Sequence, residues 1–353
     1  MLQSIKTINN PHRNPVLDIF RAIAILAVVV FHFNMALPYG YLGVDVFFVL
    51  SGTLIGSILI KEFNKENKIK FFPFILKRGF KIWPSYYFFF IVGDIVAYFI
   101  YRNIHPEYYV PVSDCKRYLL FYQNFTGIPF HVTFDCVWSL CIEEHFYILL
   151  PILLIIIQLL FKNKKAMLLF SLSTLIFLAF IFKVLALIYS HSKDTYSMSM
   201  FRMDALCWGV LIAFILNYHE SLLQKITRSY LLFFTGIIVF FILIGLNMHF
   251  GYGSFYQKTI FHSLTPIPIA LMIFSTYNMR VKRTKLVFGL QFIAYYSYNL
   301  YLWHGLLKFF IIDKYGGGIV SFMVYFVVAF ILAILSTILI EEPFLRLRAR
   351  TIR

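Results

Sequence analysis

The sequence predicts an all-α fold, a polytopic membrane helix bundle of about ten transmembrane helices. Hydrophobic residues make up 60% of the 353 residues and charged residues only 14%, which is far from the balance of a soluble domain. The apolar residues gather in stretches of about twenty, the length at which a helix spans the hydrocarbon core of a bilayer. These stretches are continuously apolar rather than alternating, which favours helices over a β-barrel.

Ten segments are expected to span the membrane. In chain order they are residues 15–37, 43–60, 83–101, 138–161, 166–190, 201–217, 230–248, 260–279, 287–312 and 319–340. The residues before the first span are polar and this span has full length, so we expect no removable signal peptide. No repeat or soluble stretch of domain size interrupts the series. We therefore expect one domain over residues 1–353, with no appended soluble domain.

Lysine and arginine are concentrated in every second connection of this predicted bundle. The basic groups lie in segments 61–81, 162–165, 225–228, 280–285 and 346–353. The positive-inside rule then places both termini in the cytoplasm. We interpret the formal net charge of +16 as attraction to anionic lipid headgroups rather than to nucleic acid. The first of these segments is expected to form a long loop that could also hold an anionic cofactor.

Two ionisable residues, Arg21 and His32, fall inside the first predicted span. Ionisable side chains are costly at this depth, so they indicate function by default. At about 1.5 Å per residue, the helix separates them by roughly 16 Å, which places one near each face of the membrane. This spacing suggests a ligand that is threaded across the bilayer.

The longest outward loop, residues 102–137, carries two of the four cysteines, Cys115 and Cys136. In an oxidising compartment these two could form a disulfide, but their spacing alone does not decide between a bridge and two free thiols. Cys141 and Cys207 lie inside predicted spans, where we expect them to be inert apolar residues.

Seven segments, read together, resemble one known family. They are LDIFRAIAILAVVVFH (17–32), GYLGVDVFFVLSGTLIG (40–56), FILKRGFKIWPSYY (74–87), VWSLCIEEHFYILLP (137–151), FRMDALCWGVLIA (201–213), YSYNLYLWH (296–304) and EEPFLRLR (341–348). In this order they resemble the acyltransferase-3 family of integral membrane proteins, which move acyl groups, usually acetyl, onto surface glycans and other acceptors. The resemblance implies an O-acyltransferase of the bacterial cytoplasmic membrane. It also implies acetyl-CoA as the acyl donor, a hydroxyl of a lipid-linked or surface polysaccharide as the acceptor, and no metal.

The resemblance also assigns donor-binding residues. The family's arginine and histidine of the first span fall on Arg21 and His32, and its Arg-x-x-Arg element falls on Arg78 and Lys81. The lysine is a departure, because arginine offers phosphate a planar fork and lysine only a mobile point charge. Arg21, Arg78 and Lys81 would hold the phosphates of the acyl-CoA. Alternatively, Arg21 forms an ion pair with Asp18, one turn earlier on the same helix.

Acyl transfer to a hydroxyl needs a base, and the ordinary pKa of histidine suits that task near neutral pH. His32 is therefore the predicted base, although a histidine bonded inside the bundle is the alternative. Glu143 is expected to orient His32, with Asp45 as the second candidate. Ser51 is assigned to the thioester path, or else bonds a carbonyl of its own helix. Gly43 and Gly52 would permit close helix packing.

Other polar residues in apolar surroundings receive weaker assignments. Arg202 and Asp204 can neutralise each other, and His304 could cap the pocket. Glu341 and Glu342 are expected to end the last helix. The main competing function is a polytopic transporter with a buried relay of arginine, histidine and glutamate, but the two halves show no internal symmetry. A nonenzymatic lipid-binding scaffold is a third possibility.

Overall fold

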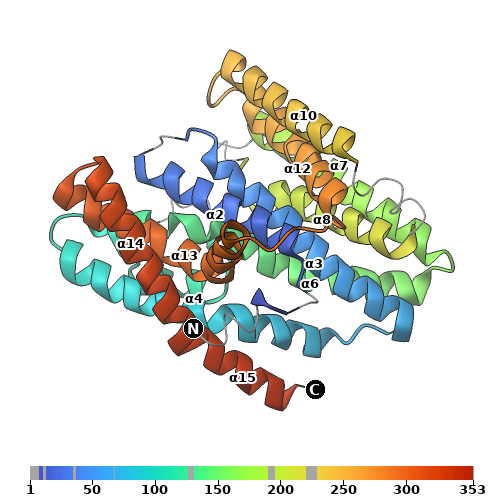
Figure 1. Cartoon of the computed structure of the whole chain (residues 1–353), viewed down its shortest axis with the longest axis horizontal. Coiled ribbons are helices and arrows are strands. Elements are labelled where there is room, and N and C mark those ends of the chain that lie inside the picture. Colours follow the sequence, from blue (N-terminus) through green and yellow to red (C-terminus); the bar gives the residue numbers. More distant parts are fainter. Residues whose placement is uncertain are drawn as a thin grey trace.

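The computed structural model contains one bundle of helices (Figure 1). It describes residues 8–10, 13–34, 37–66, 68–125, 131–189, 195–219 and 229–352, without the side chains of residues 34, 66, 132 and 313. Within these ranges every regular element is helical and no strand occurs, so the predicted all-α class is confirmed. The basic pair expected at Lys225 and Arg228 lies outside the described residues.

Each predicted span overlaps one of the long helices, although some boundaries differ. The long helices are α2 (Pro15–Asn34), α3 (Gly43–Glu66), α4 (Phe71–Tyr101), α6 (Trp138–Leu160), α7 (Lys164–Tyr189), α8 (Ser199–Tyr218), α10 (Tyr230–Phe250), α12 (Pro266–Thr276), α13 (Lys285–Tyr315) and α14 (Ile319–Ser336). Shorter elements are α5 (Val112–Leu119), η4 (Val132–Val137), η5 (Gln257–Phe261), α11 (His262–Leu264), η6 (Thr337–Glu341) and α15 (Glu342–Thr351). Among the described residues, nine helical segments are long and apolar enough to cross a membrane. α13 is equally long, is not one of these nine, and occupies the predicted ninth span.

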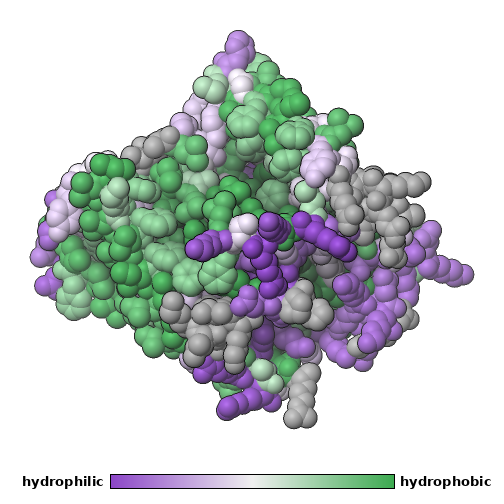
Figure 2. All heavy atoms as spheres, viewed as in Figure 1, coloured by the Kyte–Doolittle hydropathy of each residue, from purple (hydrophilic) through white to green (hydrophobic). Residues whose placement is uncertain are grey.

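Helix α2 lies at the centre of the bundle, packed between α3 and α13. α3 also packs along α8, while α13 packs along α14. α10 and α12 form a pair at one edge of the molecule (Figure 1). In Figure 2 apolar side chains cover most of the visible face, while hydrophilic ones gather where α3 ends, α4 begins and α15 lies. The polar side chains therefore mark one end of the bundle.

Glycine lets the backbones of the central helices touch. A Cβ at Gly52 of α3 would overlap the carbonyl oxygen of Leu206 in α8, and Gly209 of α8 faces α3 in the same way. A Cβ at Gly43 would overlap the carbonyl oxygen of Ala24 in α2. The predicted close approach at Gly43 and Gly52 is confirmed, and it accounts for the tight α2–α3–α8 core.

Two predicted boundaries are wrong. Residues 61–81 do not form a long loop, because α3 continues to Glu66 and α4 already begins at Phe71. The basic residues of this segment made it look polar, but they stand on helices. Glu341 and Glu342 do not end the last helix either. A π-helical turn, η6, carries the chain from α14 into α15, and both carboxylates are buried there.

All four cysteines are free thiols in the structure. Cys115 in α5 is half-buried, and burial raises the pKa of its thiol. Cys136 in η4 is fully buried. Cys115 and Cys136 are therefore two free thiols and do not form the disulfide that the sequence left open. Cys141 and Cys207 are buried inside α6 and α8 among apolar neighbours, as predicted.

Candidate active site

α2 carries both residues that the sequence singles out, Arg21 and His32. Each is half-buried, and the helix has no break between them. The rise of an α-helix therefore separates them by the expected distance of roughly 16 Å. Different groups surround the two side chains, so the site has two parts.

The first part is centred on a carboxylate and a tyrosine of α6. The hydroxyl of Tyr147 donates to Oε2 of Glu143 at 2.6 Å, one helical turn earlier. The same hydroxyl shares a hydrogen bond of 2.9 Å with Oγ of Ser51 from α3. Glu143 and Ser51, predicted for different tasks, thus belong to one hydrogen-bonded group, and Ser51 bonds a side chain rather than its own helix.

Two arginines face this group, Arg21 from α2 and Arg78 from α4. The charges of both act on Glu143 and on Tyr147. Among the described residues neither guanidinium has a side-chain hydrogen bond, although Arg78 lies over the ring of Phe74 at 5.8 Å. Two cations beside one carboxylate leave an excess of positive charge, which favours an anionic ligand.

The alternative prediction, an ion pair between Arg21 and Asp18, is wrong, because Asp18 has other partners. Asp18 accepts from Nε and Nη2 of Arg13, at 2.5 and 2.9 Å, and from Nε2 of Gln291 at 3.3 Å. The carboxylate is therefore engaged on both oxygens, and its charge reaches Arg21 only from a distance. Arg21 keeps its hydrogen-bonding capacity for a ligand.

The second part is a pair of histidines. The rings of His32 and His304, from α2 and α13, are neighbours with centroids 4.9 Å apart. Nδ1 of His32 donates to the carbonyl oxygen of Val28 at 2.9 Å, and Nδ1 of His304 donates to that of Tyr301 at 2.5 Å. A carbonyl only accepts, so Nδ1 carries the proton in each ring and Nε2 keeps its lone pair.

The structure does not bring the two expected orienting carboxylates to His32. Glu143 binds Tyr147, in the first part of the site. Asp45 forms a fully buried ion pair with Arg202 of α8. Asp45 lies on the first turn of α3, close to His32 in sequence, but its side chain turns toward α8 instead. The partner that the structure gives to His32 is His304.

A second buried ion pair lies beside the first. Lys183 of α7 donates to Oδ2 of Asp204 at 2.7 Å and to Oγ of Ser263 at 2.8 Å. The predicted mutual neutralisation of Arg202 and Asp204 is therefore wrong. Arg202 is paired with Asp45, and Asp204 is paired with Lys183. Lys183 was not among the residues predicted from the sequence. It is the lysine inside the apolar run IFLAFIFKVLALIY. A lysine within a predicted span indicates function or a buried ion pair, as the arginine at position 21 does.

Two further residues of the family motifs also have protein partners. The ammonium of Lys81 donates to the buried carboxylate of Glu341. Nε1 of Trp83 donates to Oε2 of Glu144 at 3.0 Å. Glu341 compensates the charge of Lys81. The lysine side chain is only half-buried, so it still borders the solvent.

The sequence model of a family described as "Acyltransferase domain" matches residues 14–342. This chain belongs to the acyltransferase-3 family. The matched residues include all of the groups described above, from Arg21 to Glu341. Within the described ranges no group of three or more histidine, cysteine, aspartate or glutamate side chains is arranged to hold a metal ion.

Two relatives illustrate the similarity. A Staphylococcus aureus (strain COL) protein named "Putative O-acetyltransferase SACOL0978" is 30% identical over 361 residues, which cover 94% of this chain and 57% of that protein. "O-acetyltransferase OatA" of Staphylococcus aureus (strain NCTC 8325 / PS 47) is 26% identical over 355 residues, 95% of this chain and 57% of the relative. The chain thus spans little more than half the length of these acyltransferases. No solved structure matches it significantly.

Proposed function

We propose that this acyltransferase moves an acetyl or other short acyl group from cytoplasmic acyl-CoA to a hydroxyl of a lipid-linked or surface polysaccharide. The observation that carries the proposal is the position of two chemically different sites on one helix. Arg21 and Arg78 offer unpaired positive charge at one end of α2, and the histidine pair lies roughly 16 Å away at the other end. An acyl-CoA has a matching arrangement of groups, with phosphates at one end and a thioester at the other end of an extended arm.

In this proposal the donor's phosphates bind to Arg21 and Arg78. Guanidinium groups bind phosphate with two parallel hydrogen bonds, and neither side chain has such a bond within the described part of the protein. Lys81 and Ser51 complete the predicted donor site. In the structure Ser51 adjoins this site through Tyr147, whereas Lys81 is paired with Glu341. Glu143 balances part of the arginine charge and fixes the hydroxyl of Tyr147.

The acyl transfer itself is assigned to His32. Its Nδ1 proton is held by the carbonyl of Val28, so the lone pair on Nε2 can take the proton of the acceptor hydroxyl. The hydroxyl oxygen then attacks the thioester carbonyl, the carbon–sulfur bond breaks, and the proton passes to the departing thiolate. The products are an acetyl ester and free coenzyme A. Asp45 contributes indirectly, because its ion pair with Arg202 fixes the start of α3 to α8, and α3 in turn packs against α2.

The orientation follows from the distribution of charge. The ends of α3 and α15 and the start of α4 lie on the hydrophilic side of the molecule in Figure 2, and they carry the basic segments 61–81 and 346–352. By the positive-inside rule this side faces the cytoplasm, which places the arginines where acyl-CoA is available. His32 then lies toward the opposite face, where a surface polysaccharide or its lipid-linked precursor is presented. Membrane lipids surround the bundle.

The test is release of free thiol from acetyl-CoA by purified protein in nanodiscs, with wild type and His32→Ala measured side by side. The proposal expects slow release without an acceptor, faster release with cell-wall polysaccharide, and neither in the variant. His32→Ala should still bind acetyl-CoA, since the phosphates bind at the other end of α2. Equal release by both proteins would disprove the role of His32. No release and no binding of acetyl-CoA would favour the transporter.

A further inference from the structure

The second basic position of the altered arginine motif, Lys81, is already engaged. Its ammonium donates to Oε1 of Glu341, and the other oxygen of that carboxylate accepts from Nδ2 of Asn299 at 2.8 Å. The carboxylate is only 2% exposed. If Lys81 turned to a phosphate, it would leave a buried negative charge without its cation, which is costly.

Helix α15 brings another guanidinium to the same place. Nη1 of Arg348 donates to the carbonyl oxygen of Lys77 at 3.3 Å, directly before Arg78 in the chain. The ring of Phe344 packs near that of Phe80, with centroids 6.5 Å apart, so α15 lies along α4. Arg348 is half-buried, and its charge acts on Arg78. Among the described residues no carboxylate bonds to Arg348.

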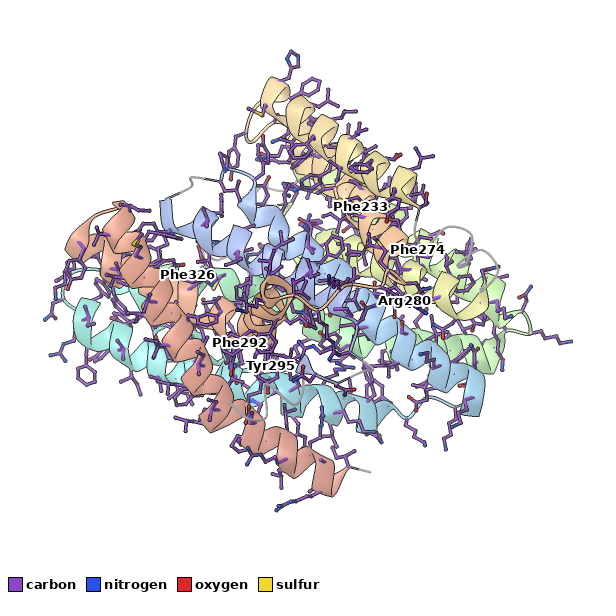
Figure 3. All side chains as sticks on the ribbon, in the orientation of Figure 1. Phe233, Phe274, Arg280, Phe292, Tyr295 and Phe326 are labelled. Carbon is purple, nitrogen blue, oxygen red and sulfur yellow. The ribbon has the colours of Figure 1, made fainter. Side chains whose placement is uncertain are left out.

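The start of α15 is fixed by its neighbours. The hydroxyl of Tyr295, labelled in Figure 3, donates to Oε1 of Glu342 at 3.1 Å. The guanidinium of Arg13 lies over the ring of the same tyrosine at 5.8 Å. Arg346 donates to Glu342 at 3.3 Å. The bond from Tyr295 joins the first turn of α15 to α13, which limits the positions that Arg348 can reach.

The result is a row of guanidinium groups from Arg13 through Arg21 and Arg78 to Arg348. The charge of each acts on the next. Asp18 forms an ion pair with Arg13 and acts on Arg21 only from a distance, while Glu143 acts on Arg21 and Arg78. Among the described residues no carboxylate bonds to Arg21, Arg78 or Arg348, so the row favours a ligand with more than one negative charge, spread along it.

We propose that Arg348 binds the ribose 3′-phosphate of the acyl-CoA and thereby selects donors that carry this phosphate. The inference rests on the proposed function, in which the donor is an acyl-CoA. Coenzyme A has a diphosphate on the side of the acyl arm and a separate phosphate on the ribose beyond it. Arg21 stands on the helix that leads to His32 and takes the diphosphate together with Arg78. Arg348, at the outer end of the row, meets the 3′-phosphate.

The experiment compares acetyl-CoA with acetyl-3′-dephospho-CoA in the thiol-release assay. Wild type should show a KM about tenfold lower for acetyl-CoA, the effect of one charge-assisted contact. Arg348→Gln should raise the KM for acetyl-CoA to that for the dephospho donor and leave the latter unchanged. Arg348→Lys should fall between them. Arg350→Gln removes an exposed arginine two residues later on the same helix and should behave as wild type.

A second arm uses inhibition. Adenosine 3′,5′-bisphosphate should compete with acetyl-CoA in wild type about tenfold better than AMP does, and this preference should vanish in Arg348→Gln. Equal KM values for the two donors in wild type would overturn the inference while leaving the proposed function intact. So would equal losses on both donors in Arg348→Gln, which would mean a structural role. Absence of thiol release with either donor in wild type would instead refute the proposed function itself.

Discussion

His32 and His304 meet edge to face, with 75° between the planes of their imidazole rings. Both rings donate through Nδ1 to a carbonyl of their own helix, which leaves two Nε2 atoms in one small region. Nε2 of His304 is buried and has no hydrogen-bond partner among the described residues. The positive charge of Lys308, one turn further along α13, acts on both rings. His304 is therefore a direct ring neighbour of the proposed base that carries a nitrogen without a hydrogen bond among the described residues.

Removal of the second ring should affect the chemical step. We expect His304→Gln to lower the rate of His32-dependent thiol release by about tenfold or more, since a misplaced base transfers protons poorly. The KM for acetyl-CoA should change less than twofold, because the phosphates bind at the other end of α2. Steady-state kinetics measure both values. His249→Gln, an exposed histidine of α10, serves as the control. A raised KM with an unchanged rate would contradict this assignment.

The arginines should show the opposite pattern. Arg21→Gln and Arg78→Gln are each expected to raise the KM for acetyl-CoA by about tenfold, because each removes a charged contact to phosphate. Arg78→Lys should recover part of this loss, since it keeps the charge without the fork. Equilibrium binding of acetyl-CoA to the protein in nanodiscs gives the same comparison without turnover. Arg102→Gln, an exposed arginine at the far end of α4, should bind as wild type.

The ion pair between Lys81 and Glu341 should contribute to stability. Lys81→Met leaves the carboxylate of Glu341 with Asn299 alone and should cost about 1–3 kcal/mol, less than a fully buried pair because Lys81 borders the solvent. Lys81→Arg should be nearly neutral. The double variant Lys81→Met/Glu341→Gln should regain most of the loss in a thermal melt. Additive losses in this cycle would show that the two side chains are not coupled.

The buried pair between Lys183 and Asp204 should matter more. Lys183→Met leaves a fully buried carboxylate without its cation, and a cost of about 3–5 kcal/mol is typical of such a change. Lys183→Met together with Asp204→Leu replaces the pair by apolar groups and should recover much of the melting temperature. Failure of the double variant to recover would mean that the pair is needed for more than its own neutralisation.

The contact between α3 and α8 should not tolerate a methyl group. A Cβ at Gly52 would overlap the backbone of α8, so Gly52→Ala must push the helices apart and should lower the apparent melting temperature by several degrees. Gly245→Ala is the matched control, because a Cβ there meets nothing within 4 Å. Equal melting temperatures for the two variants would contradict the tight packing.

The fold was largely predictable because length and hydropathy decide it. An apolar stretch of twenty residues has few alternatives in a membrane, and the first span was placed correctly with Arg21 and His32 on one helix. The start of α4 was missed because residues 71–82 combine helical structure with basic residues, which a hydropathy argument assigns to a loop. Nothing in hydropathy separates a polar helical end from a polar connection.

The partners within the site were much less predictable. Motifs identified Glu143, Asp45 and Arg78 as important, but they did not say which side chains meet. Asp45 lies near His32 in the chain, so proximity in sequence suggested a contact. Its partner Arg202 instead comes from α8, which is far away in sequence. Such pairings depend on how the spans pack side by side. The spacing of residues within one helix carries no information about that.

The ion pair between Lys183 and Asp204 also bears on how the protein is assembled. A lysine at this depth opposes insertion of α7 alone by up to about 3 kcal/mol, and an aspartate has a similar effect on α8. Lys183 lies near the C-terminal end of α7 and Asp204 near the N-terminal end of α8, the next long helix, and the two bond directly at 2.7 Å. We therefore expect α7 and α8 to enter the membrane together from the translocon as one hairpin. Each helix then supplies the counter-charge for the ionisable side chain of the other.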